Sequence, residues 1–119
     1  MRGNVLIVED EPLVALELED TVRQAGFQVR ACVGSLEKAL AVIRAGELDV
    51  AVLDCNLRGE SIVPVAAALE QRRKPFLFVS GYGRSYLPSQ YVGAPFVPKP
   101  FEPAVLVCAL ENLLRHLDQ

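Results

Sequence analysis

Acidic side chains follow two apolar runs of the sequence, and their positions suit the binding of a divalent cation. The run Val50–Leu53 ends in Asp54. The run Val5–Val8 is followed by three acids in succession, which are Glu9, Asp10 and Glu11. Because like charges close together raise one another's pKa unless a cation lies between them, a hard, oxygen-liganded metal site is predicted, and Mg²⁺ is the usual occupant beside a phosphate. The competing interpretation is that Asp54 only begins a turn or caps the next helix.

Two further polar side chains stand at the ends of apolar runs. Ser80 ends the run Phe76–Ser80, and Lys99 follows the run Ala94–Val97. Taken singly, the serine fits a glycine-rich turn and the lysine fits a surface loop. If the runs are parallel strands, however, both side chains lie at the same sheet edge as the acids. A hydroxyl, an ammonium and a metal site together would make a pocket for a tetrahedral phosphate, since each supplies a donor or positive charge to its oxygens.

The elements that would position these residues alternate between strand and helix. Short apolar runs predict five strands, which are Val5–Val8, Phe27–Val33, Val50–Leu53 with Asp54, Phe76–Ser80 and Ala94–Val97. Helical spacing and end signals predict four helices, which run from Pro12 to a stop at Gly26, from the N-cap Ser35 to Gly46, from Ile62 or Val63 to Gln71, and from Glu102 or Pro103 through Leu117. This alternation predicts an α/β fold with a parallel sheet, right-handed crossovers and helices on both faces.

The segment from Gly81 to Gly93 departs from this alternation. It includes Gly83 and Pro88 as well as its terminal glycines, and it shows no sustained helical periodicity. Gly and Pro are the strongest local breakers of regular structure. At most one or two helical turns are therefore expected between the fourth and fifth strands.

Length and composition bound the class of protein. The 119 residues correspond to one domain, taken as residues 1–119, and half of them are apolar, which is typical of a globular fold. The net charge is −3, and Lys and Arg cluster only at Arg72–Lys74, which argues against nucleic acid as a direct partner. No apolar stretch approaches the roughly 18 residues of a membrane span, and the N-terminus lacks the form of a signal peptide. Three scattered cysteines, Cys32, Cys55 and Cys108, disfavour a disulfide framework or a zinc site and favour the cytoplasm.

The motifs that carry these residues resemble the receiver domain of two-component response regulators, the CheY-like domain. The resemblance rests on Val-Leu-Ile-Val-Glu-Asp-Glu-Pro at 5–12, Val-Leu-Asp at 52–54, Ser80, and Lys-Pro-Phe at 99–101. These motifs span nearly the whole chain in the family's order. The resemblance implies a doubly wound, flavodoxin-like sheet of five parallel strands in the order 2-1-3-4-5.

The same resemblance implies roles for individual residues. Asp54 would be the phosphoacceptor, with Lys99 and Ser80 as its catalytic partners. The metal ligands would be Asp10, Asp54, the main-chain carbonyl of Asn56 and, through water, Glu9. Ser80 would also be the switch hydroxyl. A cis bond is implied between Lys99 and Pro100, which is physically plausible only because the second residue is proline.

A narrower resemblance concerns residues 75–82, which read Pro-Phe-Leu-Phe-Val-Ser-Gly-Tyr. This is similar to the "FAT GUY" receivers, which are commonly stand-alone domains associated with histidine kinases of the HWE type. The similarity implies that the receiver's fourth helix, between the fourth and fifth strands, is short or missing. Tyr82, two residues past Ser80, would flank the path of a hydrolytic water. Two positions depart from the usual receiver pattern: Arg58 replaces a common proline, and Phe96 replaces the usual switch tyrosine.

The sequence thus predicts a cytoplasmic single-domain response regulator without an effector domain, and not an enzyme beyond its own phosphorylation and dephosphorylation. Its partners would be a histidine kinase and a histidine phosphotransfer or other downstream protein, with no nucleic acid or membrane, and it would be a monomer or weak dimer. One alternative, a phosphatase of the haloacid-dehalogenase type, needs a second acid where Asn56 stands. The other, a receiver-like module that never meets phosphate, has no chemical reason to keep Asp10, Asp54, Ser80 and Lys99.

Overall fold

Five parallel strands form one sheet in the order β2-β1-β3-β4-β5 in the computed structural model, which describes residues 2–81, 83 and 86–117. The strands are β1 Asn4–Val8, β2 Gln28–Val33, β3 Val50–Asp54, β4 Phe76–Ser80 and β5 Phe96–Pro98. The predicted parallel sheet and its implied strand order are therefore confirmed. Within the described residues, no helix is long and apolar enough to cross a membrane.

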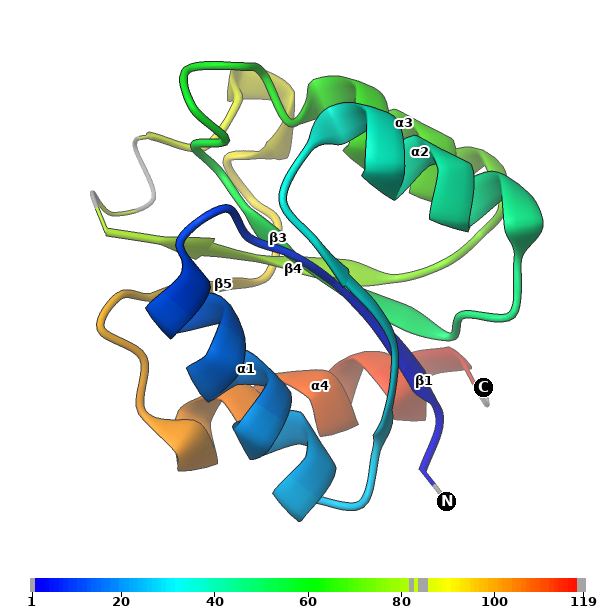
Figure 1. The fold of residues 1–119 in the computed structure, drawn as a ribbon, viewed down its shortest axis with the longest axis vertical. Helices are drawn as coiled ribbons and strands as arrows, with labels where there is room; N and C mark the ends of the chain where they lie inside the picture. Colours follow the sequence, from blue (N-terminus) through cyan, green and yellow to red (C-terminus); the bar gives the residue numbers. More distant parts are fainter. Residues whose placement is uncertain (1, 82, 84–85, 118–119) are drawn as a thin grey trace.

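Helices cover both faces of the sheet (Figure 1). On one face lie α1 (Pro12–Gln24) and α4 (Pro103–Leu117), and on the other lie α2 (Leu36–Ala45) and α3 (Val63–Gln71). Alternate residues of each central strand serve the two layers: Leu6 packs with α2 and α3, whereas Ile7 packs with α1 and α4. This is the period of two expected for a strand buried on both faces, and it explains why the central strands are almost wholly apolar.

Local signals fix the starts and stops of the helices. The Ser35 hydroxyl accepts a 3.2 Å hydrogen bond from the Lys38 N–H and so caps α2. Gly46 ends that helix with φ 83°, a conformation that side chains with a Cβ rarely adopt. Pro12 opens α1 and Pro64 stands in the first turn of α3, where a missing N–H costs nothing.

Three strands differ from the prediction in their limits: β1 begins one residue earlier, at Asn4, and β2 and β5 differ because neighbouring backbone groups bond elsewhere. The Phe27 N–H donates back to Val22 at the end of α1, so β2 begins one residue later, at Gln28. The Ala94 N–H donates to Tyr91 in a turn, so β5 begins at Phe96 rather than Ala94 and ends at Pro98. The Lys99–Pro100 bond that follows is cis, as the family resemblance implied.

The link between β4 and β5 contains the short 3-10 helix η2 (Ser89–Tyr91) in place of a full helix, within the part of the segment that the structure describes. The expectation that the helix between the fourth and fifth strands is short or missing is thus confirmed. Two of its apolar side chains, Leu87 and Tyr91, are buried and pack against the core on the α2 and α3 side. Tyr82 lies outside the described residues.

Candidate functional site

The carboxyl ends of the strands bring the predicted polar residues to one edge of the sheet. Asp54 is the last residue of β3, Ser80 is the last of β4, and Glu9 and Asp10 follow β1 directly. Lys99 follows β5, and its N–H donates a 2.9 Å hydrogen bond to the Ser80 carbonyl. In a parallel sheet the carboxyl ends of the strands lie along the same edge, and open α/β folds place their ligands at that edge.

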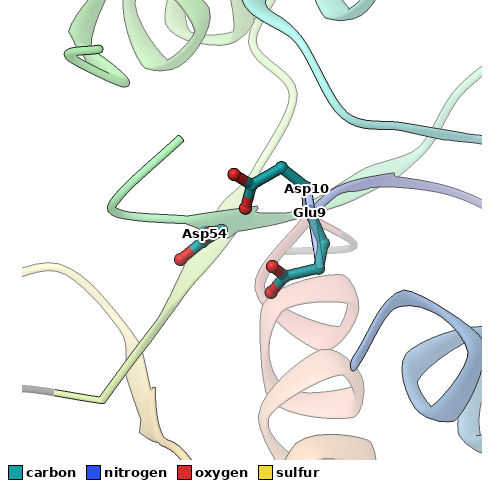
Figure 2. Close-up of side chains that lie close together, drawn as sticks. All are labelled: Glu9, Asp10 and Asp54. Atoms are coloured by element: carbon teal, nitrogen blue, oxygen red, sulfur yellow. The ribbon is translucent and has the colours of Figure 1, made fainter. Parts of the chain in front are cut away.

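Three acidic side chains, Glu9, Asp10 and Asp54, form the centre of this edge (Figure 2). Each offers one carboxylate oxygen, and these oxygens lie within 4.8 Å of one another. Glu9 and Asp54 are buried, with 3% and 5% of their surface exposed. Buried like charges at this separation require a positive partner, because neither water nor distance screens them.

Lys99 supplies part of that positive charge. Its Nζ lies 2.8 Å from Glu9 Oε1 and 3.3 Å from Asp54 Oδ1, bridging the acids after β1 and β3. Burial alone would lower the pKa of Lys99, but its contact with Glu9 and the charge of Asp54 outweigh burial and raise the pKa. The side chain therefore stays an ammonium at neutral pH.

One ammonium does not neutralise the site. Burial, and secondly the charge of Glu9, raise the pKa of Asp54 to about 6, although Lys99 and the hydrogen bond from the Asn56 N–H lower it. Glu9 Oε2 accepts a 3.1 Å hydrogen bond from the Glu11 N–H. Its Oε1 is buried and lies 2.8 Å from Lys99 Nζ, and a carboxylate oxygen in one such contact keeps further accepting capacity. Several carboxylates with a spare buried oxygen fit a hard divalent cation such as Mg²⁺.

An open cleft of about 450 Å³ lies beside these acids, and its walls include Asp54, Asn56, Ser80 and Lys99. Glu11 and Tyr86 complete its polar lining, so the cleft brings carboxylates, hydroxyls and one ammonium to a common space. Cys55 also lines it, but burial, and secondly the charge of Asp54, raise the pKa of its thiol to about 12. The thiol stays protonated at neutral pH and is a poor nucleophile there.

The loop after β3 adds a contact that the sequence reasoning missed. The Asn56 side chain accepts a 3.1 Å hydrogen bond from the Gly59 N–H, and Arg58 Nε lies 3.6 Å from Asp10 Oδ2. In the sequence, Arg58 is marked only as a departure from the family pattern, although a basic side chain four residues after Asp54 is a usable signal for this contact. Asn56 also stands where the phosphatase alternative needs an acid. Phe96 is half-buried against the core on the α2 and α3 side.

Fold and site together define an α/β signalling domain. A family model described as "Response regulator receiver domain" matches residues 5–111, and the chain belongs to that family. The chain is similar to SdrG from Sphingomonas melonis Fr1, with a TM-score of 0.84 and 40% identity over 93% of this chain and 95% of that chain. A BeF3-activated conformation of SdrG gives a TM-score of 0.80 and 38% identity, over 93% of this chain and 95% of that one.

Longer regulators contain a similar stretch. The TorCAD operon transcriptional regulatory protein TorR of Escherichia coli (strain K12) is 29% identical over 99% of this chain and 53% of its own length. The phyllosphere-induced regulator PhyR of Methylorubrum extorquens is 27% identical over 96% of this chain and 44% of its own length. The chain thus spans about half the length of the curated relatives it matches.

Proposed function

We propose that this chain accepts a phosphoryl group on Asp54 from the phosphohistidine of a histidine kinase and signals through protein contacts. The observation that carries the proposal is a buried Asp54 carboxylate that faces the cleft, with Lys99 Nζ at 3.3 Å from its Oδ1. A carboxylate with a pKa near 6 is mostly ionised at pH 7 and is available as a nucleophile. Family membership supports the same role.

In the transfer, a carboxylate oxygen of Asp54 forms a bond to phosphorus as the bond between phosphorus and the kinase imidazole breaks. The electron pair of that bond leaves with the imidazole nitrogen, and the product is an aspartyl phosphate. The Lys99 ammonium stabilises the negative charge on the phosphoryl oxygens, and the cleft orients the donor for in-line transfer. The Ser80 hydroxyl is the group that then meets the phosphoryl oxygens.

Residues of the site would also hold Mg²⁺. We assign Asp10, Asp54 and the main-chain carbonyl of Asn56 as direct ligands and Glu9 as a ligand through water, for which its spare Oε1 is suited. The bound ion would supply positive charge to the phosphoryl oxygens. The three acids are the only oxygen-rich cluster of this kind found within residues 2–81, 83 and 86–117.

The switch and the partners are part of the same proposal. We assign Ser80, Tyr82 and Phe96 to the switch, with a phenyl ring in place of a rotating hydroxyl at Phe96. Residues 1–119 would form one receiver domain, acting in the cytoplasm as a monomer or weak dimer with an HWE-type kinase. The FAT GUY pattern at residues 75–82 and the likeness to SdrG over 95% of that chain support this assignment.

Intact mass after incubation with acetyl phosphate and Mg²⁺ tests the proposal. The wild-type chain should gain one phosphoryl group, and Asp54→Ala should gain none. Asp20→Ala, which removes an exposed acid of α1, is the matched control and should be labelled like the wild type. Labelling of Asp54→Ala would exclude Asp54 as the sole acceptor.

The metal assignment has its own test. Asp10→Ala should lose Mg²⁺ binding in an amide chemical-shift titration, because it removes a direct ligand. Wild-type labelling should stop in excess EDTA. If Asp10→Ala binds Mg²⁺ as tightly as the wild type, Asp10 is not a direct ligand of the ion.

A further inference from the structure

Arg58 is the basic side chain that approaches the acidic cluster from the loop after β3. Its Nε lies 3.6 Å from Asp10 Oδ2, and the Arg58 side chain is 78% exposed whereas that of Asp10 is 13% exposed. Lys99 contacts the other two acids, Glu9 and Asp54. Arg58 and Lys99 therefore divide the three carboxylates between them.

The backbone of the loop holds Arg58 in place at some conformational cost. Leu57 is buried, and its carbonyl accepts a 2.8 Å hydrogen bond from the Glu60 N–H across a tight turn. The two central residues of that turn, Arg58 and Gly59, have φ values of 51° and 80°. A positive φ is common for glycine but uncommon for arginine. Such strain is typically retained where the side chain has a task.

We propose that the Arg58 guanidinium competes with the divalent cation for Asp10 and so sets the Mg²⁺ concentration at which the site fills. The inference rests on the proposed function, in which Asp10 is a direct ligand. A guanidinium beside a ligand oxygen repels an incoming dication, and the ion must either tolerate that charge or displace it. Because Arg58 is exposed and its side chain is flexible, displacement is the cheaper route.

The size of the effect follows from the strength of the ion pair that is displaced. Exposed pairs contribute little, so removing Arg58 should lower the Kd for Mg²⁺ by about two- to fivefold. High salt should weaken the effect, since it screens an exposed guanidinium. Positive charge, rather than the shape of the side chain, is the property that matters.

The experiment is a MgCl₂ titration of metal-free protein followed by amide chemical shifts, without any phosphodonor. Arg58→Gln is the test variant, because it removes the charge but keeps the Cβ and its backbone strain. Arg58→Lys keeps the charge and should bind Mg²⁺ like the wild type. Arg44→Gln is the matched control: it removes the same charge from the last turn of α2, at the sheet edge where β3 begins.

Tighter binding by Arg58→Gln alone, with a difference that shrinks from about 50 mM to about 500 mM NaCl, supports the inference. An unchanged or weaker affinity, or an equal gain in Arg44→Gln, overturns it while leaving the proposed function intact. If the wild type itself shows no saturable shift near Asp10, the metal assignment in the proposed function fails, and the inference fails with it.

Discussion

The Tyr91 hydroxyl donates a 2.6 Å hydrogen bond to Glu70 Oε1, which ties η2 to helix α3. The Tyr91 ring also packs against Phe76 and Phe78, with ring centroids 5.7 Å away in both cases. Burial, and secondly the hydrogen bond to Glu70, raise the pKa of Tyr91 to about 12, so the hydroxyl remains a donor at neutral pH. The segment from Gly81 to Gly93 is too rich in glycine and proline to form a full helix, and Tyr91 anchors it to the core and to α3.

Tyr91→Phe should lower the free energy of unfolding by about 1–2 kcal/mol, because a hydrogen bond to a charged group is lost while the ring is kept. Urea denaturation measures this value. Glu70→Gln keeps an accepting oxygen and should cost less than Glu70→Ala. In a double-mutant cycle, additive effects of Tyr91→Phe and Glu70→Ala would show that the two side chains do not interact energetically.

The apolar pattern alone predicts the central strands β1 and β3. Both are buried on both faces, so nearly all of their side chains pack in the core and are apolar. The same pattern predicts that the short β5 begins two residues too early, at Ala94 and not at Phe96. Its limits depend on pairing with β4, since the Phe78 N–H bonds the Pro95 carbonyl, and on the turn that takes up the Ala94 N–H. Partners supplied by another strand leave no trace in a local sequence pattern.

The candidate site was predictable to a similar degree. The rule that parallel strands end at one edge of the sheet predicts from the sequence alone that Asp54, Ser80 and Lys99 lie together. It could not predict that Lys99 reaches Glu9 at 2.8 Å, since β1 and β5 are not neighbours in the sheet. Nor could this rule predict that the Arg58 side chain points toward Asp10, because its direction depends on the positive φ of a single turn residue.

Asp54 should make the stability of the metal-free protein depend on pH. Because folding raises its pKa to about 6 from 3.8, the folded state holds the proton more tightly than the unfolded state. Its contribution to stability is therefore present below about pH 4 and is lost as pH rises through about 6. Asp54→Asn has no carboxylate to ionise, so the variant does not lose this stability as the pH rises. In EDTA at pH 7 it should therefore be more stable than the wild type by roughly 1–3 kcal/mol.

Urea denaturation in EDTA at several pH values checks this dependence. The advantage of Asp54→Asn should shrink by roughly 1–2 kcal/mol between pH 7 and pH 4.5. Mg²⁺ should stabilise the wild type more than the variant, since it binds the ionised carboxylate. A difference between the two proteins that stays constant with pH would mean that the Asp54 pKa is not raised in the folded state.

Tyr82→Ala should shorten the lifetime of the phosphorylated protein. By the family resemblance, Asn56 and Tyr82 flank the path of the attacking water, and a bulky ring there hinders in-line approach. Intact mass followed over time after removal of the phosphodonor measures the decay. Val92→Ala, which alters an exposed side chain of the same segment away from the cleft lining, is the control. An unchanged or longer lifetime in Tyr82→Ala would count against this role.

The segment from Gly81 to Gly93 should become more ordered when Asp54 carries a phosphoryl group or its beryllofluoride mimic. The Tyr86 N–H donates to the Gly83 carbonyl at 3.2 Å and the Tyr91 N–H donates to the Pro88 carbonyl at 2.8 Å, both within single turns. Single turns of this kind open locally at little cost. A phosphoryl group that draws in the Ser80 hydroxyl acts on the residue directly before the segment, and so shifts the population of the segment toward the ordered state.

Hydrogen exchange decides between this switch and a loop that the buried Leu87 and Tyr91 hold equally firmly in both states. Amides between Tyr82 and Val92 should exchange fast in the free protein and more slowly with beryllofluoride and Mg²⁺. Asp54→Ala under the same conditions should show no slowing, because the mimic has no carboxylate to bind. The slowing should be smallest at Tyr91, whose ring and hydroxyl already anchor it to Phe76 and Glu70. If the wild type shows equal protection with and without the mimic, the segment is a loop held equally firmly in both states and not a switch.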